Sequence, residues 1–145
     1  MAIIGQGYVD EIGADGKQAR RVIVKNDSPI DVSLSVKGQL QNIFNEASAV
    51  AVNSLTLINT YTIPIGKKFD FIHAICSGEN KAKFTVKVNN SIAQVKRTWW
   101  TTFNCDFNFV ELSLSSGDKV EIFVENNGSD AVKFESTIIG GLYDV

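Results

Sequence analysis

Apolar and polar residues alternate one by one along most of the chain after about residue 50. In residues 81–88, Phe84, Val86 and Val88 occupy one side of the pattern, while lysine and threonine occupy the other. Residues 119–126 repeat this pattern with valine and isoleucine. A period of two is that of a β-strand with one buried face. Clusters of Gly, Asn, Ser and Asp separate about eight such runs, a spacing typical of an antiparallel sandwich or barrel.

Several irregularities in this alternation predict turns and bulges. Phe69 and Phe71 share one parity and Cys76 takes the other, so either both faces of this strand are apolar or a bulge intervenes. A second change of parity predicts a bulge or bend near Phe109. The pair Asn89-Asn90 predicts a tight hairpin, because asparagine tolerates positive φ angles.

Residues 1 to about 45 follow a different pattern, with frequent glycines and short apolar alternations. Ile30, Val32 and Leu34 alternate with polar residues, as in a half-buried strand. The segment has too few large apolar residues for a core of its own. We therefore expect residues 1–45 to form an extended N-terminal arm that lies on a partner or on the main domain, and residues 46–145 to form the β-sandwich. No segment shows a convincing helical pattern, and the only weak candidate, for one turn, lies in residues 38–52.

The chemistry of the side chains argues against an enzyme. His73 is the only histidine, so histidine-based metal sites and catalytic triads have few components available. We expect His73 to be hydrogen-bonded at a sheet surface, and we expect no catalytic residues, no metal and no cofactor. Cys76 and Cys105 lie in apolar runs and are expected to be buried thiols. Whether they pair depends on whether their strands are neighbours.

Charge and hydropathy restrict the partners and the location. The formal net charge is −2, and a nucleic-acid-binding domain is usually clearly basic, so no nucleic acid is expected. No secretory signal and no run of membrane-spanning length is evident, so we expect synthesis in a cytoplasm and no membrane partner. Five basic residues lie between residues 81 and 97, and acidic residues predominate after residue 104. They form either a stripe for an acidic ligand or, as we prefer, opposite charges that face each other across strands or subunits.

The two tryptophans are adjacent in the segment "KRTWWTTFNCDFNF". If one strand runs unbroken from Trp99 to Phe109, Trp99 faces the core and Trp100 lies among polar side chains. A large aromatic residue on a polar face usually marks a contact, so Trp100 is a candidate interface residue. A turn between Arg97 and Phe103 would void this division.

Two stretches resemble a known group of folds. "LSLSSGDKVEIFVEN" (residues 112–126) is similar to a hairpin of the trimeric jelly rolls of the tumour-necrosis-factor and C1q type. "FESTIIGGLY" (residues 134–143) resembles the closing strand of that group. The resemblance implies an all-β, antiparallel jelly-roll sandwich of about eight strands, here preceded by the extended N-terminal arm.

The layout of the whole chain resembles that of small virion structural proteins of tailed bacteriophages, of the head-decoration, neck or fibre-base type. It combines a glycine-rich arm, the segment "IDVSL" and a β-domain that opens with "TYTIPIGKKFDFIHAICSG". This resemblance implies a non-enzymatic virion protein that assembles with itself, as a homotrimer or ring, and with other virion proteins. The alternative is a glycan-binding attachment module that uses Trp100. The residues expected at interfaces are Trp100, Lys96, Arg97, Ile30, Val32, Leu34 and Tyr143.

Overall fold

The computed structural model describes residues 37–99 and 102–145. The expectations for the arm, including Ile30, Val32 and Leu34, and for Trp100 lie outside the described residues. The described strands are β2 (Gln39–Val50), β3 (Leu55–Thr62), β4 (Lys67–Gly78), β5 (Ala82–Val88), β6 (Ser91–Arg97), β7 (Asn104–Ser115), β8 (Lys119–Asn126) and β9 (Val132–Asp144).

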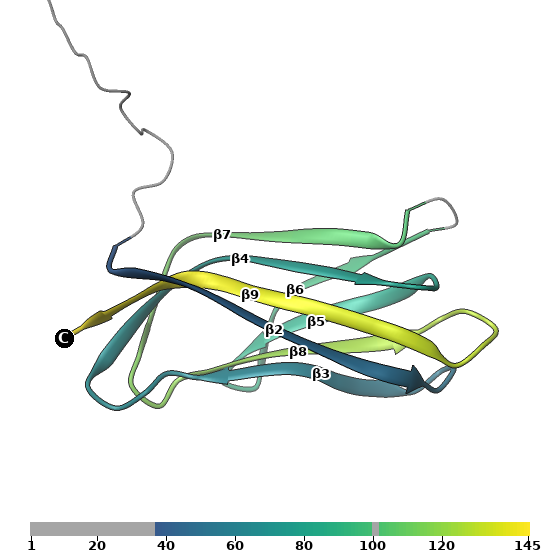
Figure 1. Cartoon of the computed structure of the whole chain (residues 1–145), viewed down its shortest axis with the longest axis horizontal. Coiled ribbons are helices and arrows are strands. Elements are labelled where there is room, and N and C mark those ends of the chain that lie inside the picture. The colour runs from purple at the N-terminus through teal and green to yellow at the C-terminus, as the bar shows by residue number, and fades with distance from the viewer. Residues whose placement is uncertain (1–36, 100–101) are drawn as a thin grey trace, which may run out of the picture. The chain divides into compact units, whose positions relative to one another are not determined.

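These eight strands form two antiparallel four-stranded sheets that pack face to face (Figure 1). The first sheet has the order β2-β9-β4-β7 and the second has the order β3-β8-β5-β6. Consecutive strands mostly belong to different sheets, which is the connectivity of a jelly roll. The predicted all-β jelly-roll sandwich is therefore confirmed.

Strand β2 differs from the sequence-based expectation for this segment. The weak helical pattern at residues 38–52 is a strand from Gln39 to Val50, paired with β9 along almost its whole length. The prediction of a helical turn there is wrong, because cross-strand pairing with β9 outweighs a weak local preference. Residues 39–45, which we had assigned to the arm, belong to the first sheet.

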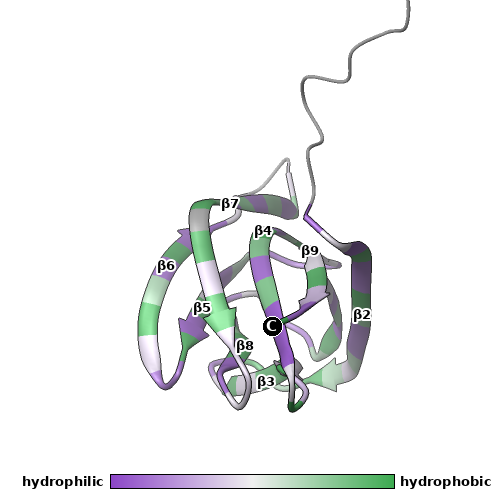
Figure 2. Ribbon diagram, turned by 90° about the vertical axis from the view of Figure 1, so that its left-hand side faces the viewer, coloured by the Kyte–Doolittle hydropathy of each residue, from purple (hydrophilic) through white to green (hydrophobic). Residues whose placement is uncertain are grey.

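The core between the two sheets is built around phenylalanines. Phe69, Phe71, Phe84, Phe107 and Phe134 are all buried, and they come from both sheets. Aliphatic side chains of β5 and β8 fill the space between them, as the alternation in these two strands predicted. Figure 2 shows the same alternation as bands of hydrophobic and hydrophilic residues along the strands, β7 for example.

A bulge in β4 determines which of its side chains reach this core. The register shifts between Phe71 and His73 in the pairing with both neighbouring strands, so Ile72 is an extra residue relative to β9. As a result Phe71 and Cys76 are both buried despite their opposite parity in the sequence. Strand β7 accommodates the same irregularity near Phe109, where a bulge or bend was predicted.

The turns have the backbone geometry that their residues favour. Asn89 and Asn90 have φ angles of 50° and 70°, as expected for the hairpin between β5 and β6. Gly117 has a φ of 89° in the turn before β8. There Asp118 Oδ2 accepts a hydrogen bond from the Ser115 backbone N–H at 2.7 Å, which holds the pKa of this carboxyl below its usual value.

Hydrogen bonds from one buried asparagine link the two sheets near their β2 and β3 edges. Asn59, on β3, is 2 % exposed. Its Nδ2 donates to the backbone carbonyls of Ile43 at 2.9 Å and Ser136 at 3.1 Å, on two strands of the first sheet. A buried amide that satisfies two carbonyls fixes the position of the sheets more specifically than apolar contact alone.

We expect Asn59→Ala to lower the free energy of unfolding by about 2–4 kcal/mol, because it leaves buried carbonyls without a partner and opens a small cavity. Urea denaturation of the purified protein measures this difference. Asn42→Ala, at an exposed position on β2, is the matched control and should change stability by less than about 0.5 kcal/mol. Equal losses in the two variants would contradict the role given to Asn59.

Candidate interaction surfaces

The outer face of the first sheet carries a continuous group of apolar side chains. Leu40 and Phe44 on β2 are 51 % and 55 % exposed, and Ile75 on β4 is 40 % exposed. Phe44 and Ile75 flank the same residue of β9, Thr137, in the strand register. Ile139 lies two residues further along β9, on the same face and half-buried. We call Leu40, Phe44, Ile75 and Ile139 the apolar face.

The polar positions between these apolar side chains are uncharged, whereas the carboxylates of Asp70 and Asp106 lie at the border of the apolar face. Asn42, His73 and Thr137 fill the register positions between the apolar side chains. His73 Nδ1 donates to Asn108 Oδ1 of β7 at 2.7 Å, which confirms the expected hydrogen-bonded histidine at a sheet surface. Its position among isoleucine, asparagine and threonine suits a surface that contacts another surface better than a catalytic centre.

Tyr143, an expected interface residue, lies on β9 beyond the apolar face. Its hydroxyl donates to Asp70 Oδ1 at 3.1 Å, and the Lys37 ammonium lies 4.6 Å from the centroid of its ring. The side chain is half-buried, so it can contribute to a contact through its remaining exposed surface.

The outer face of the second sheet has a different character, because charges pair across its strands. Lys83 of β5 lies 3.2 Å from Glu125 of β8, and the Lys87 ammonium lies 4.8 Å from the centre of the Phe123 ring. The basic strand β5 therefore faces the acidic strand β8, which agrees with our preferred interpretation of the uneven charge. Leu57 of β3 is exposed on the outer face of this sheet, where it pairs with Phe123 in the register, and so is Leu55.

Lys96 and Arg97, also expected at an interface, lie on β6 at the edge of the second sheet. The Lys96 ammonium donates to the Asp106 backbone carbonyl of β7 at 2.6 Å, and Gln94 Nε2 donates to the Asn108 carbonyl at 2.8 Å. Lys96 thus connects the two sheets along this edge. Arg97 is exposed and pairs with Lys83 in the register. Lys96 and Tyr143 lie on different sheets and do not form one site.

The tryptophan segment does not form the unbroken strand that would bury Trp99. Trp99 and Thr102 exchange two backbone hydrogen bonds, at 3.3 and 3.2 Å, and β7 begins only at Asn104. The chain therefore reverses direction between them, and Trp99 is 63 % exposed. The prediction that Trp99 belongs to the core is wrong, since the strand period was applied across a turn.

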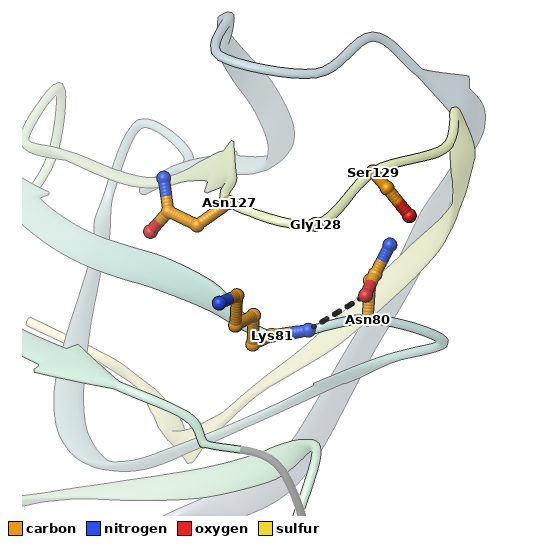
Figure 3. A pocket seen from close by; sticks show the side chains of 5 residues that line it. All are labelled: Asn80, Lys81, Asn127, Gly128 and Ser129. Atoms are coloured by element: carbon orange, nitrogen blue, oxygen red, sulfur yellow. Dashed lines mark hydrogen bonds between the residues drawn. The ribbon is translucent and has the colours of Figure 1, made fainter.

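A polar cleft lies beside this turn, at the end of the sandwich where β4 joins β5 and β8 joins β9. Figure 3 shows its lining, which consists of Asn80, Lys81, Asn127, Gly128 and Ser129 around a volume of about 380 Å³. The β4–β5 and β8–β9 loops pack closely against each other, because the Asn80 amide occupies the space that a side chain at Gly128 would need. In the sequence, residues 125–130 fit either a loop that holds a cation or an ordinary loop between two strands, and neither interpretation includes the contact with Asn80.

Backbone hydrogen bonds place Trp99 next to the cleft. The Thr98 N–H donates to the Ala82 carbonyl. Trp99 follows Thr98 and Lys81 precedes Ala82, so these two residues are neighbours on adjacent segments of the same chain. On the other side, the Asn127 N–H donates to the Lys81 carbonyl at 3.0 Å. An exposed tryptophan thus lies at the same end of the sandwich as a group of amide and hydroxyl side chains.

Comparisons with known proteins do not assign the chain to a family. No protein-family model matches it, and no curated protein matches it. In residues 37–99 and 102–145, no group of three or more His, Cys, Asp or Glu side chains could hold a metal ion. The same residues contain no helix with the length and hydrophobicity that a membrane crossing requires. The functional argument therefore depends on the fold and on these surfaces.

Proposed function

We propose that this protein is a non-enzymatic structural component of a bacteriophage particle, of the decoration, neck or fibre-associated kind. In this proposal it is made in the host cytoplasm and assembles on the virion. It binds copies of itself, as a homotrimer or ring, through the β-sandwich, and binds other virion proteins through its N-terminal arm. The jelly-roll topology supports the proposal, because this architecture recurs in viral capsid proteins.

The observation that supports self-association in this proposal is the apolar face. Three large apolar side chains, Leu40, Phe44 and Ile75, are each at least 40 % exposed on one side of one sheet. A continuous exposed apolar surface usually marks a contact, whereas single exposed apolar residues do not. The outer face of the second sheet also exposes large apolar residues, Leu55, Leu57 and Val95, but paired charges such as Lys83 and Glu125 lie among them. We therefore assign the apolar face to contact between copies of the chain.

We expect Phe44→Ser to weaken self-association about 10- to 100-fold per contact, since burying one phenylalanine contributes about 1.5–3 kcal/mol. Sedimentation equilibrium over a range of protein concentrations measures the change in mass. Leu57→Ser is the matched control: it removes an apolar residue of comparable exposure from the outer face of the other sheet and should leave the mass unchanged. A wild-type protein that stays monomeric at every concentration would contradict this role of the apolar face.

The arm requires a separate test. Deletion of residues 1–36 leaves β2 and all of the pairing between β2 and β9, so the sandwich should keep its β-sheet circular dichroism spectrum and its melting temperature. We expect the truncated protein to lose incorporation when particles assemble in its presence, as measured by its copy number on purified particles. Normal occupancy would show that the arm is not the anchor.

A second candidate function is glycan binding, and one observation favours it. Trp99 is exposed beside a cleft lined by Asn80, Asn127 and Ser129. Aromatic rings offer an apolar surface for stacking, and amide and hydroxyl groups offer the hydrogen bonds that orient a polar ligand. This cleft and the neighbouring Trp99 would form the attachment site, whereas Trp100, the residue expected from the sequence, lies outside the described residues.

If the glycan hypothesis holds, Trp99→Ala and Asn80→Ala each reduce binding to an immobilised glycan array at least about tenfold, and Trp100→Ala does so as well. The matched control is Ile92→Ala, which is 64 % exposed and lies near the end of β6 opposite to Arg97 and Trp99; this variant should bind as the wild type does. If the wild-type protein binds no glycan on the array, the hypothesis fails and the assembly proposal is unaffected.

A further inference from the structure

The two cysteines of the chain lie directly opposite each other in the first sheet. Cys76 of β4 and Cys105 of β7 are register partners, and these two strands are antiparallel neighbours. Directly opposite residues of antiparallel strands have Cα atoms about 4.5 or 5.5 Å apart, depending on the type of pair. Both separations fall within the range of about 4.4–6.8 Å that a disulfide spans.

The side chains of both cysteines point toward the interior, where they contact each other. Cys76 is fully buried in the core, and Cys105 is half-buried and packs against it. Their thiols share a hydrogen bond. The two thiols can therefore pair without a change in the register of β4 and β7.

The environments of the two thiols differ in a way that sets the order of reaction. The hydrogen bond from Cys76 lowers the pKa of the Cys105 thiol, and the nearby Lys96 ammonium acts in the same direction, while burial and Asp106 oppose them. The same hydrogen bond and burial raise the pKa of the Cys76 thiol. Cys105 is thus the more accessible and the more nucleophilic partner, since the thiolate is the reactive form.

We propose that Cys76 and Cys105 form a disulfide between β4 and β7 when the folded protein meets an oxidising solution that contains a small-molecule disulfide. The Cys105 thiolate attacks one sulfur of that disulfide and releases one thiolate, which takes up a proton. Cys76 then loses its proton and attacks the Cys105 sulfur, releasing the second small thiol. The protein loses two protons and two electrons, and the oxidant takes them up to become two thiols.

The disulfide would link β7, which lies at the edge of the first sheet, covalently to β4. Strand β7 is an edge strand of the first sheet, held on one side by β4 alone. The bridge closes a loop that contains β5 and β6, so it constrains the unfolded chain over a substantial length. This proposal is independent of the assembly function, because it concerns one chain and its interior.

The experiment incubates the full-length native protein with glutathione disulfide, then denatures it and alkylates the remaining thiols before mass spectrometry. We expect the wild type to lose both alkylatable thiols, to carry no bound glutathione, and to melt roughly 5–15 °C higher than the reduced protein. A wild type that keeps two alkylatable thiols, or that forms only disulfides between chains on a non-reducing gel, overturns the proposal.

Two single variants test the order of reaction independently of the melting temperature. Cys76→Ala should accumulate a glutathione mixed disulfide at Cys105, because the resolving thiol is absent. Cys105→Ala should take up no glutathione while folded, because Cys76 is fully buried. If the Cys105→Ala variant is modified as fast as the Cys76→Ala variant, the assignment of Cys105 as the attacking thiol is wrong.

Discussion

The bulge at Ile72 is the constraint on which the other features of the first sheet depend. Strand β4 pairs with both β7 and β9, so its register determines which residues of three strands share a face. A shift by one residue would exchange the two faces of the strand beyond the bulge. Because Ile72 is an extra residue relative to β9, Cys76 faces the core while His73 and Ile75 face outward. The apolar face and the cysteine pair therefore both follow from the position of this one residue.

Polar side chains close the two open edges of the sandwich. On one edge Asn59 binds carbonyls of the opposite sheet, and Asn45 Nδ2 returns a hydrogen bond to the Ile58 carbonyl at 3.0 Å. On the other edge Gln94 and Lys96 of β6 donate to backbone carbonyls of β7. Unpaired strand edges favour pairing with other chains, and these bonds occupy some of the edge backbone groups that such pairing would use. Lys96 had been expected at an interface, but its ammonium group is engaged within the chain.

The sequence predicted the parts of the fold in which one physical signal dominates. Alternation was unambiguous at Phe84 and Val86, and positive φ angles were expected at Asn89 and Asn90, so the core strands and this hairpin agree with the structure. Prediction from the sequence failed where tertiary pairing or a turn overrides the local pattern. Residues 39–50 pair with β9 despite a weak helical pattern, and Trp99 lies outside β7, in line with the alternative that a turn between Arg97 and Phe103 interrupts the strand. The cleft could not be predicted, because Asn80 and Gly128 meet only after two loops fold together.

Because of the strand order, the two ends of the sandwich carry different loops and different parts of the chain. The connections that follow β2, β4, β6 and β8 lie at the end with Trp99 and Asn80 (Figure 1). Gly38 and the C-terminus lie at the other end, where the Val145 N–H donates to the Gly66 carbonyl. The described chain thus enters and leaves the sandwich on the same side. Anything attached at either point leaves four loops on the opposite side unobstructed. The two ends of the sandwich are therefore separated by the full length of the strands, so sequence changes in the loop at Ser129 would lie far from the points where the described chain enters and leaves the sandwich.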